Sequence, residues 1–95
     1  MDVIEKIQSW YASQCDGDWE HQFGVTIDTL DNPGWSVKID LVRTSLENVS
    51  VDPLKKDHGD QDWIFCEVRN NEFLGAGDPS KLRQILEFFI TLTEF

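Results

Sequence analysis

The 95-residue chain is poor in cysteine, methionine and basic residues, and it contains no long apolar run. Two cysteines are too few for the disulfide framework of a small secreted domain. No apolar stretch approaches the roughly 20 residues that a bilayer-spanning helix needs, and the acidic opening lacks the basic region of a signal peptide. We therefore expect a cytoplasmic protein in which Cys15 and Cys66 are free, largely buried thiols. A disulfide between them is the less favoured alternative.

The scarcity of basic side chains leaves a strong negative charge. Eight lysines and arginines stand against 18 acidic residues, for a formal net charge of -10. Residues 1–35 alone contain seven acidic residues and one basic residue. Such a field repels nucleic acid and anionic membranes and attracts cationic surfaces. We therefore expect no nucleic-acid or membrane partner, and solubility alone is the competing explanation of the acidity.

Apolar residues make up 40% of the chain, which suffices for one hydrophobic core, and the length fits one domain over residues 1–95. Helical spacing of apolar residues predicts a helix over residues 2–14 with Asp2 as its N-cap. Asp78 and Pro79 have the residue types of an N-cap and a first helical position, and they predict a second helix. The core stripe of that helix is expected to consist of Leu82, Ile85, Leu86 and Phe89.

Alternating apolar residues between the two helices predict strands. The runs 23–27 and 35–41 flank Asn32-Pro33-Gly34-Trp35, which fits a type II turn with a positive φ at Gly34. Residues 62–68 and 72–77 predict a second hairpin with its turn at Asn70-Asn71. Residues 43–61 are ambiguous, because an edge strand competes with a loop indicated by Pro53 and a polar run. We predict an α+β fold: an antiparallel sheet of four to five strands with the N- and C-terminal helices packed on one face.

Carboxylates and tryptophans are concentrated in residues 10–41. Asp16, Asp18 and Glu20 surround Trp19 in one short stretch, and buried carboxylates are costly unless they are paired. Core packing does not require this mixture. The stretch is therefore either an acidic rim that meets a basic partner or a small polar site, and we favour the partner.

The four tryptophans are assigned from their positions in the predicted elements. Trp10 on the apolar helix face and Trp63 in mid-strand are expected in the core. Trp19 in the acidic stretch and Trp35 at the hairpin base are expected to be partly exposed, and tryptophan is enriched among interface hot spots. Burial of Trp19 in the core is an alternative of equal weight.

A small metal-dependent hydrolase is the rival interpretation of the acidic stretch, with Asp16, Asp18, Glu20 and His21 as its site. Oxygen ligands at alternate positions resemble the start of a calcium loop. However, Ile27 stands where an EF-hand has its bidentate glutamate. No nucleophile motif or phosphate-binding loop is complete either. We therefore predict no catalytic residue, no metal ligand and no cofactor.

Residues 10–41 resemble the signature of the immunity protein 53 family, and weaker similarity continues to the end of the chain. The matching residues are Trp10-Tyr11, Gln14 to His21, Gly24, Ile27, Thr29 to Trp35 and Ile39 to Leu41, then Asp62-Trp63, Phe73, Gly75 and Leu82. Members of this family are small bacterial proteins encoded beside polymorphic toxins. The resemblance implies an antitoxin that binds and blocks a cognate toxin, and it brings no catalytic residue with it. Many such toxins are nucleases with basic active sites.

Charge, aromatic content and resemblance together predict a one-to-one toxin interface. The acidic stretch is expected at its centre, with the turn at residues 31–35 adjacent. The predicted partner-binding residues are Asp16, Asp18, Trp19, Glu20, His21, Asp31, Asn32 and Trp35. A homo-oligomeric interaction module using Phe88, Leu92 and Phe95 is a third hypothesis, and the chain is expected to be a monomer or a weak homodimer.

Overall fold

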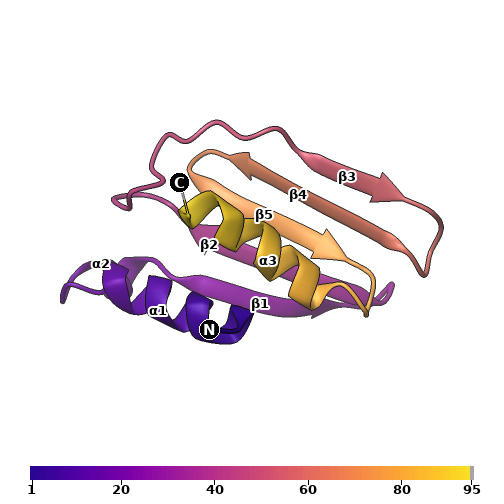
Figure 1. Cartoon of the computed structure of the whole chain (residues 1–95), viewed down its shortest axis with the longest axis horizontal. Coiled ribbons are helices and arrows are strands. Elements are labelled where there is room, and N and C mark those ends of the chain that lie inside the picture. Colours follow the sequence, from indigo (N-terminus) through magenta and orange to yellow (C-terminus); the bar gives the residue numbers. More distant parts are fainter. Residues whose placement is uncertain (95) are drawn as a thin grey trace.

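The computed structural model describes residues 1–94 as two layers, a sheet and the helices that cover one of its faces (Figure 1). The elements are α1 (Val3–Gln14), α2 (Trp19–Gln22), β1 (Val25–Leu30), β2 (Gly34–Asp40), β3 (Leu54–Asp57), β4 (Trp63–Arg69), β5 (Glu72–Gly77) and α3 (Leu82–Thr93). The five strands are antiparallel and have the order β1-β2-β5-β4-β3. This arrangement confirms the α+β fold expected from the sequence.

Interactions between neighbouring residues determine the start of α1 and the turn of the β4–β5 hairpin, and both form as predicted. α1 begins with a capping box, in which Asp2 accepts from the N–H of Glu5 at 2.9 Å and Glu5 accepts from the N–H of Asp2 at 3.4 Å. The two carboxylates satisfy N–H groups that the start of a helix leaves without a partner. Asn70 and Asn71 join β4 to β5, and both have the positive φ of a tight hairpin turn, 54° and 59°.

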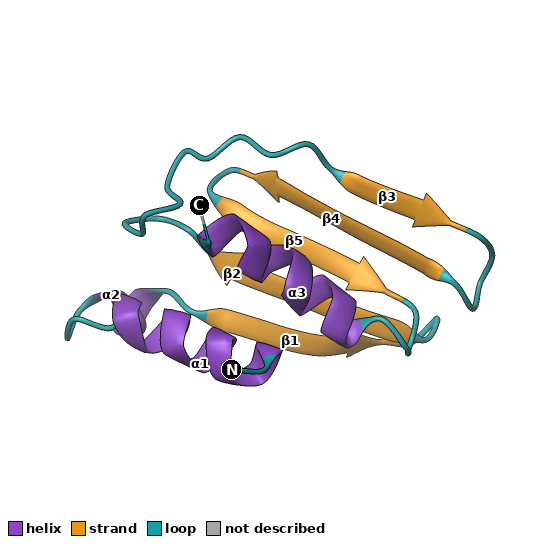
Figure 2. Cartoon of the chain, viewed as in Figure 1, coloured by secondary structure: helices purple, strands orange, loops and turns teal. Residues whose placement is uncertain are grey.

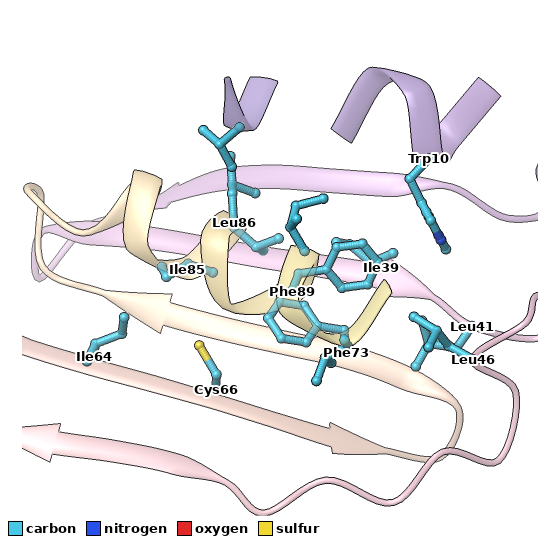
Figure 3. Packing of buried hydrophobic residues seen from close by; sticks show 14 of the residues in the cluster. Trp10, Ile39, Leu41, Leu46, Ile64, Cys66, Phe73, Ile85, Leu86 and Phe89 are labelled. Atoms are coloured by element: carbon cyan, nitrogen blue, oxygen red, sulfur yellow. The ribbon is translucent and has the colours of Figure 1, made fainter. Parts of the chain in front are cut away.

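The hydrophobic core lies between the sheet and the helices (Figure 3). Side chains along a strand alternate between the two faces, so every second strand residue points toward the helices. The strands contribute Val37, Ile39, Ile64, Cys66 and Phe73, and Leu41 directly follows β2. The helices contribute Trp10, Ile85, Leu86, Phe89, Ile90 and Leu92. Trp10 meets Phe89 edge to face at 4.9 Å between ring centroids, so α1 packs against α3. The stripe predicted for the final helix is confirmed.

Both cysteines are free, as the sequence predicts. Cys66 lies in the core, where burial raises the pKa of its thiol to about 12. Cys15 is half-buried at the end of α1, where its thiol donates to the carbonyl oxygen of Tyr11 at 3.3 Å. A thiol with a raised pKa is a poor nucleophile at neutral pH, so the role of Cys66 is packing.

The first hairpin differs from the predicted type II turn. The Asn32–Pro33 peptide bond is cis, and β2 begins at Gly34, which pairs with Leu30 and does not have a positive φ. A β-carbon at Gly34 would overlap the carbonyl oxygen of Gly77 and contact the ring of Trp63. Close packing across the strands, and not turn geometry, therefore explains the glycine.

The ambiguous segment 43–61 contains the edge strand β3. Figure 2 shows the long loop that leads from β2 to it, and Leu46 of that loop is buried in the core. The strand includes Lys55 and Lys56, which belong to the polar run that indicated a loop. An edge strand with both of these side chains in solvent needs no apolar alternation, so periodicity gave no signal there.

The last helix begins later than predicted, and Asp78 is not its N-cap. Asp78 is buried and accepts from the N–H groups of Trp63 and Ser80, each at 2.8 Å. It also accepts from the hydroxyl of Ser80 at 2.6 Å and from the ammonium of Lys81 at 2.7 Å. These groups compete with the helix terminus for the carboxylate. Asp78 therefore ties the start of β4 to the turn before α3.

Trp63 is not in the core, although its mid-strand position predicted burial. It alternates with Ile64, which faces the helices, so Trp63 lies on the uncovered face of the sheet. It is half-buried there, as are Phe65 and Leu74. Alternation predicts that Trp63 and Phe65 share a face, and only the position of the helices decides which face that is.

Candidate protein-binding surface

The carboxylates of Asp16 and Glu20 hold the loop between α1 and α2 in its conformation, because they accept hydrogen bonds from its backbone. Asp16 accepts from the backbone N–H groups of Asp18 and Trp19, each at 2.9 Å, and Glu20 accepts from those of Asp16 and Gly17 at the same distance. The N–H groups of Trp19 and Asp18 lower the pKa of Asp16. Those of Glu20 itself, Asp16 and Gly17 lower the pKa of Glu20. Both acids therefore stay ionised and act as caps.

Asp18 forms an ion pair across the same loop. Its Oδ2 lies 2.8 Å from Arg43 Nη1, and the guanidinium lies over Phe23 at 5.5 Å from the ring centroid. Each of the three carboxylates thus has an intramolecular partner, but only Asp18 is paired with a basic side chain. Asp16 and Asp18 remain exposed, as does His21. The loop therefore keeps a net negative charge, whose field can attract a positively charged molecule.

Trp19 is a core residue and not an exposed anchor, so the expectation of a partner contact through its ring is corrected. Its side chain is only 1% exposed, and its Nε1 donates to the carbonyl oxygen of Val42 at 2.8 Å. The indole lies 6.2 Å from the ring of Trp10, edge to face, and 6.1 Å from that of Phe23. α2 folds Trp19 back over the end of α1, where it cannot contact another molecule.

The turn at residues 31–35 does not adjoin the acidic loop, contrary to the prediction. The six residues of β1 separate the two regions. At about 3.3 Å per residue this corresponds to roughly 20 Å, with the loop and the turn at opposite ends of the strand (Figure 1). Asp31 and Asn32 are exposed, but Trp35 is half-buried and its Nε1 donates to the carbonyl oxygen of Pro79 at 2.9 Å. The predicted set therefore divides into two groups.

Two of the residues named in the oligomerisation hypothesis, Phe88 and Leu92, face inward. Phe88 is half-buried and stacks on Phe73 at 6.2 Å between centroids, and Leu92 is buried. Phe95 lies outside the described residues. Phe88 and Leu92 therefore serve the core.

Exposed apolar side chains gather on α1 and β1, and none of them is among the residues predicted to bind a partner. The large apolar residues that are exposed among residues 1–94 are Met1, Ile4, Tyr11 and Ile27. Ile4 is 51% exposed, Tyr11 39% and Ile27 42%. The sequence gives an indication of this exposure, because the apolar stripe of α1 is wider than a core contact requires. Val3 and Trp10 of that stripe are buried, whereas Ile4 and Tyr11 are not.

A groove of about 310 Å³ runs between α1 and β1. Its lining residues are Ile7, Gln8, Tyr11, Gly24 and Val25. Ile4 lies one turn before Ile7 on the helix, and Ile27 follows Val25 on the same strand face, so both extend the apolar lining. We call the surface formed by Ile4, Ile7, Tyr11, Val25 and Ile27 the α1–β1 surface.

The α1–β1 surface lies in the acidic part of the molecule. Residues 1–35, with seven acidic residues and one basic residue, form α1, α2, β1 and the following turn. Figure 1 shows these elements together along one side. Asp28 and Asp31 are exposed and have no ion-pair partner among residues 1–94. Apolar exposure and negative charge therefore coincide on this side.

Buried Asp78 and Lys81 form a polar cluster before α3 with exposed Asp62 and Ser80, and this cluster lacks a catalytic base. Lys81 Nζ lies 3.3 Å from Ser80 Oγ, which is the contact that a serine–lysine nucleophile needs. The ammonium also lies 2.8 Å from Asp62 and 2.7 Å from Asp78, and these carboxylates raise the pKa of Lys81. A protonated lysine cannot accept the proton of a hydroxyl group. Within residues 1–94, no three His, Cys, Asp or Glu side chains are grouped so as to hold a metal ion.

These features define a small two-layer α+β protein whose most exposed apolar residues lie in an acidic setting. A family model, Immunity protein 53, matches residues 4–94, and the chain belongs to this family. Comparison with curated proteins and with solved structures finds no match. The family is one of toxin immunity proteins, which are generally non-enzymatic. None of the helices in residues 1–94 is long and apolar enough to cross a bilayer.

Proposed function

We propose that the chain is a cytoplasmic immunity protein that binds one cognate bacterial toxin domain and blocks it, with no catalysis, metal or cofactor of its own. Family membership over residues 4–94 supports this role. A nuclease is the toxin class that we favour. Active sites that hold phosphates are basic, and a net charge of -10 complements them.

We assign the contact to the α1–β1 surface, and one observation carries this assignment. The exposed large apolar residues and the acidic excess of residues 1–35 occur on the same side of the molecule. Apolar contact at the centre of an interface slows dissociation, whereas surrounding charge accelerates encounter. Tyr11 is the exposed aromatic residue of this surface.

The acidic residues predicted from the sequence act in this proposal as a rim. Asp16, Asp18 and Glu20 form the rim at one end of β1, with His21 beside them, and Asp31 forms it at the other end, with Asn32 beside it. Their charge steers a basic partner toward the groove between them. Trp19 and Trp35 support the two ends from inside, through their hydrogen bonds to Val42 and Pro79.

The test compares two charge reversals of equal size at opposite edges of the sheet. Asp28→Lys with Asp31→Lys changes the α1–β1 side, and Asp52→Lys with Asp57→Lys changes the β3 side. All four side chains are exposed, so both double variants are expected to fold. Association with the toxin domain encoded by the neighbouring gene is measured by stopped-flow at low salt. We expect the first pair to lower the association rate constant by about 10-fold and the second by less than about 2-fold.

Two results would contradict the proposal in different ways. Equal slowing by both double variants would mean that only the net charge matters, and the assignment to the α1–β1 surface would be wrong. No binding of the toxin domain by the wild-type chain would refute the immunity role itself. A charge reversal in the acidic loop itself, Asp18→Lys with Glu20→Lys, is unsuitable for this test. Glu20 caps the loop, and reversing its charge would unfold that loop.

A further inference from the structure

We propose that the toxin binds by adding a strand to β1, as a sixth strand of the sheet that lies beneath α1. This inference rests on the proposed function and specifies how the partner is held. It follows from three features of the β1 edge: unpaired backbone groups, an overhanging helix and negative charge.

The outer backbone groups of β1 are identified by the register of the first hairpin. The N–H of Asp40 donates to the carbonyl oxygen of Gly24 at 3.1 Å, so the pair Gly24 and Asp40 is of the hydrogen-bonded kind. Residues alternate along an antiparallel pair, and even-numbered residues of β1 therefore bond to β2. The N–H and C=O groups of Val25, Ile27 and Thr29 point away from β2. None of them has a backbone partner among residues 1–94.

α1 is placed to cover a strand that this chain does not supply. Figures 1 and 3 both place the helix along the outer side of β1, and its buried residues pack toward α3. A strand added to β1 would lie about 4.8 Å outside it, on the sheet side of the helix. Its side chains would then enter the groove beside Ile7 and Val25 and cover Ile4, Tyr11 and Ile27. Without such a strand these apolar side chains have no cover, which accounts for their exposure.

The β1 edge also specifies the chemistry of the incoming strand. Side chains that point toward α1 would neighbour Val25 and Ile27, so apolar residues are favoured at alternate positions. The side chains between them would lie on the other face beside Thr26 and Asp28, where lysine or arginine is favoured opposite Asp28. The segment that fits is therefore an extended strand of a basic protein with alternating apolar and cationic residues.

A second copy of this chain fits the edge less well than a basic partner does. Each copy would bring a net charge of -10, and β1 with its turn contributes Asp28 and Asp31 without a lysine or arginine. Like charges brought together at a strand edge are destabilising. Self-pairing through β1 is therefore a competing outcome that sedimentation analysis of the free chain detects.

The experiment uses two substitutions of the same residue. Ile27→Ala and Ile27→Pro both remove the exposed side chain, but only Ile27→Pro removes the outward N–H. Proline is tolerated in an edge strand where the N–H faces solvent, so both variants are expected to fold, which circular dichroism verifies. Binding of the toxin domain from the neighbouring gene is measured by calorimetry. We expect Ile27→Pro to raise the dissociation constant at least about 10-fold over Ile27→Ala.

Hydrogen exchange of the wild-type chain supplies a second readout that needs no variant. The amides of Ile27 and Thr29 should exchange rapidly in the free protein and become protected in the complex, because strand addition gives them acceptors. If the toxin domain binds but these amides stay unprotected and the two Ile27 variants bind equally, strand addition is refuted and the immunity role stands. If the wild-type chain does not bind the toxin domain, both proposals fail. A homodimer with protected Ile27 and Thr29 amides would assign the edge to self-pairing instead.

Discussion

At one edge of the sheet, β3 is four residues long, follows Pro53 and contains Lys55 and Lys56. At the other edge, β1 is six residues long and contains no proline, lysine or arginine. Short strands, prolines and lysines are devices that discourage edge-to-edge pairing. β3 combines all three, whereas β1 has none and instead exposes Ile27 beside α1. One edge of this sheet is thus protected against an added strand and the other is open, and the open edge is the acidic one.

The two sides of the molecule are also anchored by different chemistry. Beside β1, the indole of Trp19 fixes α2 and the end of α1 through aromatic contacts and a hydrogen bond to Val42. Beside β4 and β3, the buried carboxylate of Asp78 fixes the start of β4 through Lys81 and backbone N–H groups. An apolar anchor does not depend on pH, whereas an ionic anchor does. Substitutions of Trp19 and of Asp78 therefore test the stability of the two sides separately.

The largest expected effect on stability comes from Trp19→Ala. Removal of a fully buried indole leaves a cavity and the unpaired carbonyl oxygen of Val42, so the free energy of unfolding should fall by about 3–5 kcal/mol. Urea denaturation followed by circular dichroism measures this loss. Tyr11→Ala, on the exposed side of the same aromatic cluster, is the control and should cost less than about 1 kcal/mol. A loss for Trp19→Ala as small as that of the control would mean that the indole is not buried.

The second largest effect is expected from Asp78→Ala, which leaves Lys81 and the N–H of Trp63 without this carboxylate. The melting temperature at pH 7 should fall by more than about 10 °C, because the buried ammonium of Lys81 keeps only Asp62 as an ion-pair partner and the N–H of Trp63 loses its acceptor. Thermal unfolding by circular dichroism measures the shift. Asp60→Ala, at an exposed acid that has no side-chain hydrogen bond within residues 1–94, should leave the melting temperature within about 3 °C.

The Asp78 anchor also predicts a pH dependence of definite sign. Lys81, the hydroxyl and N–H of Ser80 and the N–H of Trp63 hold the pKa of Asp78 below its usual value. The stabilisation is therefore complete above the unfolded-state pKa of about 3.9 and is lost as the pH falls toward the lower folded-state pKa. The difference in melting temperature between the wild-type chain and Asp78→Ala should shrink below about pH 4. A difference that stays constant from pH 7 to pH 3 would contradict the ionic anchor.

The sequence predicts the elements well where neighbouring residues decide the conformation. Asp2 and Glu5 form their capping box within one helical turn, and Asn70-Asn71 forms its turn from the conformational freedom of asparagine. The α3 stripe is likewise a local pattern, confirmed by the burial of Ile85 and Phe89. Prediction fails where a distant group competes for the same side chain. Asp78 has the residue type of an N-cap, but its Oδ2 accepts from the N–H of Trp63, fifteen residues away, and from Lys81, while its Oδ1 accepts from Ser80.

The candidate surface was harder to predict than the fold, for a geometric reason. The acidic loop is visible in the sequence, but its hydrogen bonds are not, so Glu20 looks free when it is a cap. The burial of Trp19 and the exposure of Trp63 depend on which face the helices cover. Ile4 and Tyr11 fit the same helical stripe as Trp10, and only the position of α1 outside β1 leaves them exposed.

The smallest effect on stability is expected from a change that makes β1 resemble β3. Thr26→Lys with Ile27→Lys adds two lysines to an exposed edge, so the free energy of unfolding should change by less than about 1 kcal/mol. Toxin affinity should nevertheless fall at least about 10-fold, because charged side chains on an edge oppose strand addition. Calorimetry in about 1 M salt measures the affinity under conditions where the Debye length is about 3 Å, which minimises the effect of the changed net charge.

The reciprocal change at the protected edge completes this comparison. Lys55→Thr with Lys56→Ile removes the lysines of β3 and should leave toxin affinity within about 2-fold of the wild-type value, since the partner strand adds to β1. If the β3 variant loses affinity while the β1 variant keeps it, the roles of the two edges are reversed. If neither variant changes affinity, the toxin does not use a sheet edge. The uncovered face with Trp63, Phe65 and Leu74 then becomes the surface to substitute next.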